Sequence, residues 1–280
     1  MQVVTTIAEL RAQLDPMRRE GRSIGFVPTM GYLHQGHAAL VQAARRECDV
    51  VVVSIFVNPL QFAPSEDYES YPRDPERDRG ILAAAEVDFL FQPDVREMYP
   101  RPLLTQVSVP ELSATLEGRT RPTHFQGVAT VVLKLFHIVG PHRAYFGQKD
   151  GQQVAVVRRL IEDLDLPIEL RAVETVREPD GLALSSRNVY LSPEERQAAP
   201  CLHEALLQGR EAALAGQGSR AVQAAIEARI RRTPLACLDY AAVVDPRTMQ
   251  PKSDLTGPVM LAVAASLGRT RLIDNLVLEL

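Results

Sequence analysis

The stretch that decides the fold is Ser23-Ile24-Gly25-Phe26-Val27-Pro28-Thr29-Met30, which is soon followed by His34-Gln35-Gly36-His37. The apolar run predicts a buried strand over residues 23–27 that ends in a proline-containing loop. From Gly36 onward, apolar residues recur at helical spacing and predict a helix over residues 36–47. The two histidines therefore lie where a strand ends and a helix begins, which is where parallel sheets bind their ligands.

This predicted helix start has the chemistry of an anion site. A helix N-terminus offers backbone N–H groups and the positive end of the helix dipole. Gly36 lacks a Cβ atom, so a phosphate can approach the backbone closely. His34 and His37 can each donate a hydrogen bond to a phosphate oxygen. The same tetrapeptide also fits a helix start with surface histidines, so the rest of the chain must decide between the two interpretations.

Apolar strand-like runs alternate with helical patterns up to residue 176, which indicates a parallel α/β sheet. The predicted strands cover residues 23–27, 50–57, 87–91, 143–146 and 168–176. The predicted helices cover residues 36–47, 75–85, 128–139 and 151–163.

Beyond residue 176 the pattern changes to helices followed by clustered strands, which indicates a smaller α+β domain. The predicted helices cover residues 194–214 and 220–231, and the predicted strands cover residues 238–244, 259–265 and 271–278. The polar boundary contains the turn signal Pro179-Asp180-Gly181. We therefore expect one domain over residues 1–175 and a second, able to act as a lid, over residues 176–280.

Composition excludes several classes of protein. The formal net charge of −4 gives no broad basic surface for nucleic acid. Cys48, Cys201 and Cys237 show neither a disulfide framework nor metal-ligand spacing, so buried thiols in a reducing compartment are expected. The longest apolar run, near residues 50–57, is too short to cross a bilayer, and residues 1–20 lack the apolar core of a signal peptide. We expect a cytoplasmic protein without a membrane partner.

Three further polar segments follow predicted strands or the domain boundary. In Asn58-Pro59-Leu60-Gln61-Phe62 the carboxamides suit a hydroxyl-bearing substrate, although a capped Asn-Pro turn explains Asn58 at least as well. In the segment from Phe146 to Gln153, Lys149 offers a charge to phosphate oxygens, and Asp150 caps a helix or holds a ribose hydroxyl. Leu184-Ser185-Ser186-Arg187-Asn188 reads either as a loop that grips polyphosphate or as a Ser-rich linker.

With these segments in view, the chain resembles the pantothenate synthetase (pantoate–β-alanine ligase) family of the HxGH nucleotidyltransferase-like superfamily. The resemblance spans nearly the whole chain in the family's order. The matching stretches are Val27-Pro28-Thr29-Met30-Gly31-Tyr32-Leu33-His34-Gln35-Gly36-His37, Ser54-Ile55-Phe56-Val57-Asn58-Pro59-Leu60-Gln61-Phe62, Arg121-Pro122-Thr123-His124-Phe125, Tyr145-Phe146-Gly147-Gln148-Lys149-Asp150, Asp180-Gly181-Leu182-Ala183-Leu184-Ser185-Ser186-Arg187-Asn188 and Arg271-Leu272-Ile273-Asp274-Asn275.

The resemblance implies an ATP-dependent condensation of (R)-pantoate with β-alanine, which gives pantothenate, AMP and pyrophosphate through a pantoyl adenylate. This reaction belongs to pantothenate and coenzyme A biosynthesis. The resemblance also implies a Rossmann-like domain that binds ATP and pantoate, followed by the smaller α+β lid. Mg²⁺ with the ATP and a homodimer are further expectations of the same kind.

The resemblance also implies roles for individual residues. His34 and His37 would lie at the ATP phosphates, with His37 as the general acid and Lys149 as a third catalytic residue. Gln61 would bind pantoate and β-alanine, and Gln153 would bind pantoate. The residues that would line the ATP site are Met30, Gly31, Tyr32, Leu33, His34, Gln35, Gly36, His37, Gly147, Gln148, Lys149, Asp150, Val176, Leu184, Ser185, Ser186 and Arg187.

Some positions depart from familiar versions of the family. Gln148 stands where many relatives have Glu, and Gly151 where many have Tyr or Ala, but neither should supply the reacting charge. Arg77-Asp78 stands where relatives carry adjacent acidic residues, so we expect ATP phosphates and water, rather than the protein, to hold Mg²⁺. Asp78 could support Mg²⁺, but we expect it to be a carboxylate on the surface of a helix. Arg121 resembles a position on the dimer-facing side.

Three other functions remain open at this point. A nucleotidyltransferase that adenylylates a phosphate-bearing metabolite would share His34 and His37 but would not need Gln61 and Gln153. A class I aminoacyl-tRNA synthetase would need an anticodon domain and a basic surface for tRNA. A non-catalytic nucleotide-binding module would bind ATP without exchanging pyrophosphate. The chain lacks the Walker-type phosphate loop and the Gly-x-Gly-x-x-Gly fingerprint, which disfavours several other enzyme classes.

Overall fold

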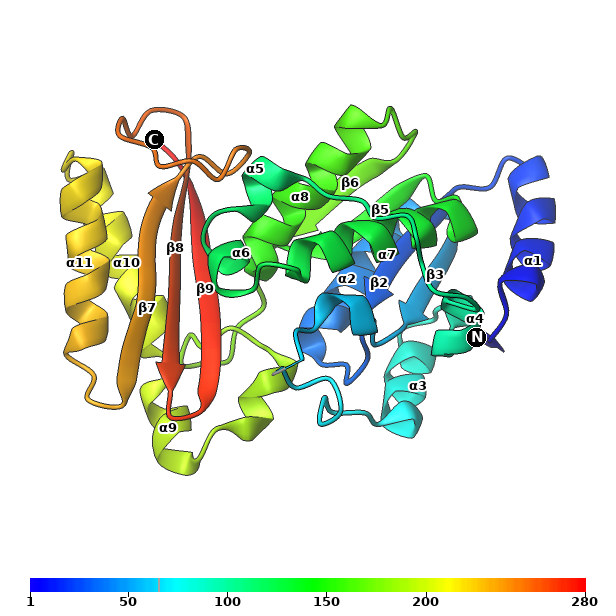
Figure 1. Ribbon diagram of the computed structural model, residues 1–280, viewed down its shortest axis with the longest axis horizontal. Coiled ribbons are helices and arrows are strands. Elements are labelled where there is room, and N and C mark those ends of the chain that lie inside the picture. Colours follow the sequence, from blue (N-terminus) through cyan, green and yellow to red (C-terminus); the bar gives the residue numbers. More distant parts are fainter. Residues whose placement is uncertain (65) are drawn as a thin grey trace. The chain divides into compact units, whose positions relative to one another are not determined.

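A computed structural model describes residues 1–64 and 66–280 (Figure 1). These residues form two compact units, Met1–Gly147 with Val156–Val173 and Gln148–Ala155 with Glu174–Leu280. The first unit contains a six-stranded sheet and the second a three-stranded sheet. The predicted α/β fold class is confirmed, while the domain boundary at residue 175 stays a prediction.

The strands of the first sheet are all parallel to their neighbours and lie in the order β1-β4-β3-β2-β5-β6. They are β1 (Gln2–Val4), β2 (Ile24–Thr29), β3 (Val50–Ile55), β4 (Phe89–Phe91), β5 (Arg143–Gly147) and β6 (Glu169–Val173). β3 is an interior strand and all of its residues are buried, which explains its unbroken run of Val and Ile.

The strand order reverses beside β2, because β3 and β4 lie on one side of it and β5 and β6 on the other. β2 pairs with β5 only at Gly25 and Phe26. Pro28 comes after this pairing has ended, which explains why a residue without an N–H is tolerated in an interior strand. Ligands of open parallel sheets bind at the carboxyl ends of strands beside such a reversal, so the loop after β2 is the expected site.

Helices cover both faces of this sheet. Phe26 packs edge-on against Phe136 of α7, whereas its neighbour Val27 packs in one cluster with Leu40 and Ala44 of α2. Since successive strand residues point to opposite faces, α7 and α2 lie on opposite sides of the sheet. The helices before β5 are α1 (Ile7–Arg19), α2 (Gln35–Glu47), α3 (Pro75–Ala84), α4 (Val95–Met98), α5 (Pro110–Ser113), α6 (Glu117–Thr120) and α7 (His124–Val139), with the 3₁₀ turn η1 (Pro59–Gln61).

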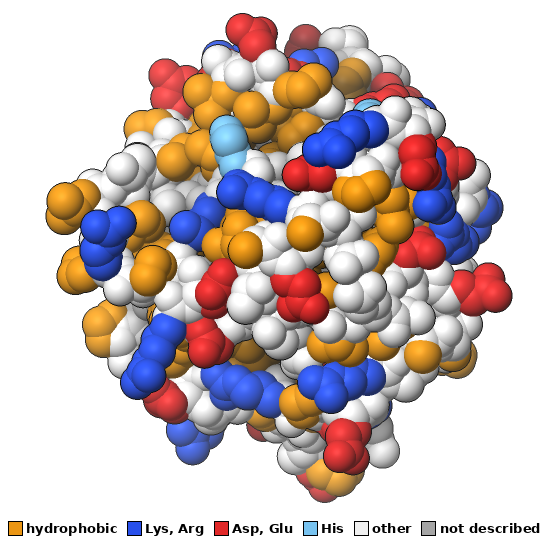
Figure 2. Space-filling view, turned by 90° about the vertical axis from the view of Figure 1, so that its right-hand side faces the viewer, with side chains coloured by type: hydrophobic (Ala, Val, Ile, Leu, Met, Phe, Trp, Pro, Cys, Tyr) orange, Lys and Arg blue, Asp and Glu red, His pale blue; other side chains and the backbone are white. Residues whose placement is uncertain are grey.

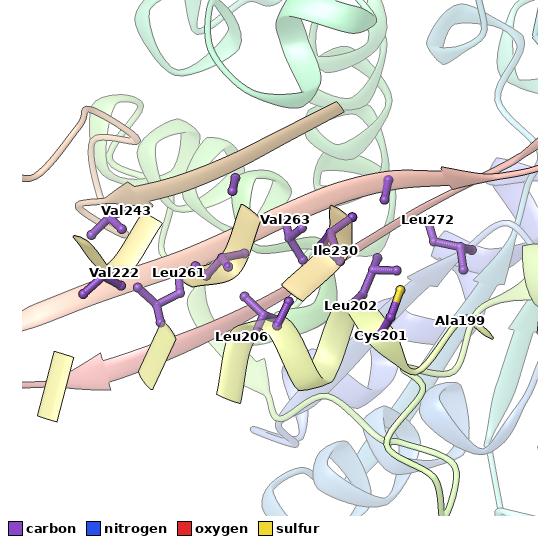
Figure 3. Close-up of a cluster of buried hydrophobic side chains, with 14 of the residues drawn as sticks. Ala199, Cys201, Leu202, Leu206, Val222, Ile230, Val243, Leu261, Val263 and Leu272 are labelled. Atoms are coloured by element: carbon purple, nitrogen blue, oxygen red, sulfur yellow. The ribbon is translucent and has the colours of Figure 1, made fainter. Parts of the chain in front are cut away.

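The second sheet is antiparallel in the order β7-β8-β9. Its strands are β7 (Ala236–Val244), β8 (Pro258–Leu267) and β9 (Thr270–Glu279). The other elements beyond β5 are η2 (Gln148–Asp150), α8 (Gly151–Asp163), η3 (Ser186–Tyr190), α9 (Pro193–Ala198), α10 (Cys201–Leu214) and α11 (Ser219–Arg231). Figure 3 shows how Leu202, Leu206 and Ile230 from α10 and α11 meet Leu261 and Val263 of β8 in one apolar core.

Most predicted elements are confirmed within a few residues, and α8 has the predicted bounds. The predicted helix over residues 194–214 is wrong in one respect, because it is two helices that separate at Pro200. β1 and α1 were not indicated by the sequence pattern. The N-terminal segment is polar overall, and only Leu10 and Leu14 of α1 are fully buried.

The surface agrees with the charge of the chain. On the face in Figure 2, Lys and Arg side chains are interspersed with Asp and Glu rather than gathered into one basic surface. Cys48 and Cys201 are buried thiols as expected, whereas Cys237 is exposed. Among the described residues, no helix combines the length and apolar character needed to cross a membrane.

Candidate active site

The loop after β2 turns sharply before α2 begins. Gly31 and Tyr32 both have positive φ, at +85° and +50°. A Cβ atom at Gly31 would lie 2.9 Å from Cγ2 of Ile55 and 3.0 Å from Oδ2 of Asp78, so both the conformation and the space require glycine. The Thr29 hydroxyl accepts the Gly31 N–H at 3.2 Å and donates to the Ser54 carbonyl at 2.8 Å. The loop therefore has one specified shape.

Asp78 of α3 holds the same loop through its carboxylate. Its Oδ2 accepts the N–H of Tyr32 at 2.8 Å, and its Oδ1 accepts the N–H of Leu33 at 2.7 Å. The side chain is buried, so the expectation of a surface carboxylate is wrong; α3 turns this position toward the loop. Burial raises the pKa of Asp78, although the two backbone N–H bonds act against that rise. Both oxygens are used to hold backbone.

The two imidazoles of His34-Gln35-Gly36-His37 cap the N-terminus of α2. His34 is the N-cap residue, and its Nδ1 accepts the N–H of Gly36 at 3.1 Å. Nδ1 of His37 accepts the N–H of His34 at 3.2 Å. The His34 side chain also accepts from the backbone N–H of His37, which together with the His37–His34 bond makes a reciprocal capping box, and the ring centroids lie 4.1 Å apart. The motif thus builds its own helix start.

This capping also determines which ring nitrogens of His34 and His37 can donate. A neutral imidazole has one donor and one acceptor nitrogen, so acceptance at Nδ1 assigns the proton to Nε2. Each ring therefore carries an N–H donor at Nε2, beside the positive end of a 13-residue helix. Several N–H donors at a helix N-terminus suit an anion with several oxygens, such as a phosphate.

Gln61 lies in η1, after β3, and its carboxamide is held on both sides. Its Oε1 accepts from Nδ2 of Asn58 at 3.2 Å, and its Nε2 donates to Sδ of Met30 at 3.0 Å. Asn58 itself caps η1 and donates to the Gly127 carbonyl at 3.1 Å. The capping interpretation of Asn58 is confirmed, and two of the predicted site residues, Met30 and Gln61, are in contact.

The backbone of Gln61 is fixed by side chains from the segment that leads into α7. Its carbonyl is 2.9 Å from Nδ1 of His124 and accepts from Nη2 of Arg121 at 3.3 Å. Arg121 makes a two-pronged ion pair with Glu66, at 2.8 Å and 2.6 Å. A Cβ atom at Gly127 would lie 2.2 Å from the carbonyl oxygen of Leu60, so α7 packs directly against η1. The dimer-facing role of Arg121 stays a prediction.

In the second unit, η2 carries Gln148, Lys149 and Asp150. The carboxamide nitrogen of Asn275 in β9 donates to the carbonyls of Gln148 and Lys149, at 2.9 Å and 2.8 Å. The Gln148 side chain donates back to Oδ1 of Asn275 at 3.1 Å. Nζ of Lys149 lies 3.5 Å from Oδ1 of Asp150. Gln153 is half-buried in the first turn of α8.

The predicted phosphate-gripping loop also lies in the second unit. Its base is a backbone bridge between Arg177 and Ala183, followed by the Leu184 N–H bonded to the Val176 carbonyl at 3.0 Å. The Ser185 hydroxyl accepts the N–H of Arg187 at 3.3 Å and so caps η3. Ser186 is buried. The Ser-Ser-Arg segment is therefore an ordered turn.

The predicted site residues thus form two groups. The first, in the Met1–Gly147 unit, comprises residues 30–37, Gln61 and Gly147; the second comprises residues 148–150, Gln153, Val176 and residues 184–187. The sequence interpretation missed the anchoring roles of Asp78, of Asn275 and of its neighbour Asp274, whose carboxylate pairs with Arg177. Adjacent Asp and Asn in the middle of a strand pattern are a usable signal, because strands are depleted in both residues.

The described residues contain no cluster of three or more His, Cys, Asp or Glu side chains that could hold a metal ion. Asp78, the carboxylate considered above as a possible Mg²⁺ ligand, uses both oxygens on backbone N–H groups. The side chains of this chain therefore do not fit a protein-held Mg²⁺ at Asp78.

Comparison with known proteins gives one consistent family. The family model described as pantoate-beta-alanine ligase matches residues 2–277. A pantothenate synthetase from Brucella canis is 53% identical over 280 residues, covering 99% of this chain and 96% of that protein.

Solved structures agree with the sequence comparison. The fold is similar to that of pantothenate synthetase from Thermus thermophilus, with a TM-score of 0.94, 55% identity and 99% of both chains covered. It is also similar to pantoate-beta-alanine ligase from Francisella tularensis complexed with β-γ ATP and β-alanine, with a TM-score of 0.80 and 35% identity, covering 99% of this chain and 97% of that one. The chain therefore belongs to the pantoate–β-alanine ligase family.

Proposed function

We propose that this chain joins (R)-pantoate to β-alanine in two steps, with a pantoyl adenylate between them. Membership in the family supports the ATP-dependent condensation itself. In the first step a carboxylate oxygen of pantoate attacks the α-phosphorus of ATP, and pyrophosphate leaves. In the second step the amine of β-alanine attacks the carbonyl carbon, loses a proton, and AMP leaves with the oxygen that joined it to the acyl group. The products are pantothenate, AMP and pyrophosphate.

The start of α2 is the observation that carries the first step. The Nε2 donors of His34 and His37 would bind the phosphates of ATP, beside the loop of Met30, Gly31, Tyr32 and Leu33. No covalent bond to the protein is needed, so catalysis reduces to positioning and to stabilising charge on the phosphates. Through its Nε2–H, His37 would donate a hydrogen bond to the leaving pyrophosphate and so stabilise the charge that develops on it.

Gln61 and Gln153 would select the acid and the amine. The Gln61 carboxamide has a fixed direction, because Asn58 and Met30 contact its two ends. It can both donate and accept, which suits the hydroxyls of pantoate and the amine of β-alanine. Gln153 on the first turn of α8 would contribute a second carboxamide to pantoate.

The second group of residues would contact the nucleotide from its own unit. Lys149 would place a positive charge against the phosphates, with Gly147, Gln148 and Asp150 around it. The ordered turn from Leu184 to Arg187 and the backbone of Val176 would contact the nucleotide from their own unit. N–H donors capped in place, as Ser185 caps η3, support such a grip on phosphate oxygens.

Mg²⁺ would enter as part of the ATP substrate. Oxygen ligands from phosphates and water satisfy Mg²⁺, which keeps much of its hydration shell in proteins. The commitment of both Asp78 oxygens to the loop supports a metal held by ATP rather than by this carboxylate.

We further propose a homodimer that works in the cytoplasm, with a domain boundary near residue 175 and residues 176–280 as the lid. Free thiols at Cys48, Cys201 and Cys237 support a reducing compartment. Analytical ultracentrifugation tests the dimer. Limited proteolysis with and without ATP tests the boundary, since cleavage near residue 175, just before the ordered 176–187 loop, is expected and ATP should slow it.

The reaction is tested by pyrophosphate–ATP exchange with β-alanine left out. Exchange that depends on pantoate is expected, because without the amine only the adenylation step can run, and running it backward returns pyrophosphate to ATP. Absence of exchange with pantoate, together with ATP turnover on a phosphate-ester metabolite, would instead identify a nucleotidyltransferase. ATP binding without exchange under any condition would identify a non-catalytic module.

A further inference from the structure

β9, an edge strand of the second sheet, carries two adjacent polar residues, Asp274 and Asn275, that are both buried. They are 3% and 5% exposed and lie opposite Val263 and Ala262 of β8. Because successive strand side chains point to opposite faces, the two residues serve different sides of the sheet. A buried polar side chain is costly unless it is fully bonded, so the partners of this dipeptide need an explanation.

Asn275 fixes η2 with all of its carboxamide. Its Nδ2 bonds the carbonyls of Gln148 and Lys149, and its Oδ1 accepts from the Gln148 side chain. The contact is tight, because a Cβ atom at Gly151 would lie 3.2 Å from Nδ2 of Asn275. The backbone that carries Lys149 is therefore held by a side chain that follows it by 126 residues.

Asp274 fixes the base of the 176–187 loop. Its two oxygens receive the fork of Arg177, at 2.6 Å from Nη1 and 2.9 Å from Nη2. Arg177 also donates to the Gly181 carbonyl at 3.1 Å and pairs with Ala183 through the backbone bridge. Oδ1 of Asp274 accepts the backbone N–H of Asn275 at 2.8 Å as well, which ties the two residues together.

We propose that Asp274 and Asn275 are positioning residues, which hold the Lys149 segment and the Ser185–Arg187 turn in the positions from which each contacts the nucleotide. This inference rests on the proposed nucleotide contacts of those two segments. Its physical basis is preorganisation, since a group that is misplaced by about 1 Å can lose on the order of 100-fold in rate. One dipeptide can set both segments because the pleat of β9 directs its two side chains to opposite faces.

Two substitutions at Asn275 test the proposal. Asn275→Ala removes the hydrogen bonds between the Asn275 carboxamide and η2. Asn275→Asp keeps the shape of the side chain but places a carboxylate oxygen against the carbonyl oxygens of Gln148 and Lys149. We expect pantoate-dependent exchange at saturating ATP to fall roughly 10- to 100-fold in both. In the double variant Lys149→Ala/Asn275→Ala the losses should combine to less than their product, because Asn275 acts through the position of Lys149.

The control is Asp239→Asn, which removes the carboxylate partner of Arg271 between β7 and β9 of the same sheet. Its exchange rate should stay within about twofold of wild type, as for a surface ion pair. Thermal unfolding of every variant reports whether it is folded. Where Asn275→Ala does not fold, Arg177→Lys tests the Asp274 contact, because lysine keeps the charge but cannot make both guanidinium hydrogen bonds to Asp274. The KM for ATP should then rise about tenfold.

The outcomes separate this inference from the proposed function. A folded Asn275→Ala protein with wild-type exchange, or losses that multiply fully with Lys149→Ala, would overturn the positioning role alone. If the wild-type protein shows no pantoate-dependent exchange, the proposed function fails and the inference built on it fails too. We expect a reduced exchange rate in both Asn275 variants and an unchanged rate in the Asp239→Asn control. The loss in the double variant Lys149→Ala/Asn275→Ala should be smaller than the product of the two single losses.

Discussion

Two helix starts in this chain follow parallel strands, yet they are built in different ways. α2 begins after β2 and is capped by the side chains of its own motif, His34 and His37. η2 and α8 begin after β5, and the η2 backbone is held by Asn275, far along the chain in β9. The sequence shows the same layout of strand, glycine and helix in both. A motif that satisfies its own backbone can be found locally, whereas one that depends on a distant strand cannot.

The largest expected effect is that of His37→Ala, which removes a phosphate donor and half of the capping box. Loss of one donor to developing charge costs about 10²–10³-fold in rate. Loss of a cap costs about 1 kcal/mol of stability. Pantoate-dependent exchange and chemical denaturation measure the two effects on the same protein. The control is His137→Ala, which should change neither quantity, because His137 is exposed on α7 and its Nδ1 contacts the Leu133 carbonyl of the same helix.

Lys149→Ala should reduce exchange by a similar factor of about 10²–10³ but leave stability nearly unchanged. The Lys149–Asp150 pair is partly exposed, and such pairs contribute about 0–1 kcal/mol. The η2 backbone keeps its bonds to Asn275 in this variant. Denaturation curves that shift as far as those of His37→Ala would show that the two helix starts are not built differently.

Asp78→Asn tests a distant group that supports the loop before the first helix start. The side-chain amide nitrogen of the new asparagine would face the backbone N–H of Tyr32 or Leu33. One buried N–H donor then loses its acceptor, which lowers the free energy of unfolding by about 1–3 kcal/mol. We expect the KM for ATP to rise about tenfold through the displaced loop. Glu76→Gln, two residues earlier on α3, is the matched control. An equal KM for ATP in both variants would contradict the role of Asp78 in holding the loop.

The smallest expected effect is the pH dependence of the stability that the Glu66–Arg121 ion pair contributes. Burial alone would raise the pKa of Glu66, but the ion pair with Arg121 outweighs it and the pKa lies below its ordinary value of 4.5. Because the folded pKa is lowered, the ion pair stabilises the protein above the ordinary pKa and loses this effect as the pH falls through the folded pKa. The difference in unfolding free energy between wild type and Glu66→Gln, at most about 1 kcal/mol, should therefore shrink on acidification. A difference that grows toward acid pH would contradict the assignment.

The sequence predicted the parallel sheet, most element bounds and the helix start at His34 and His37, because these depend on local periodicity and on a motif that caps itself. It did not reveal α1, where two buried leucines are hidden among polar residues, or the break at Pro200. It placed Asp78 on the surface, because a carboxylate on a charged helix gives no local sign that a loop will fold onto it. Asp274 and Asn275 were missed as anchors for the same reason, since their partners precede them by about a hundred residues or more.

The most direct test of the account follows the oxygen atoms of pantoate. Pantoate labelled with oxygen-18 in its carboxylate is incubated with ATP, β-alanine and the enzyme, and the nucleotide product is examined by mass spectrometry. Attack on the α-phosphorus predicts AMP that carries one labelled oxygen, because the bond to the acyl carbon breaks when the amine enters. Unlabelled AMP, or label in orthophosphate, would contradict a pantoyl adenylate and with it the central role of the α2 helix start.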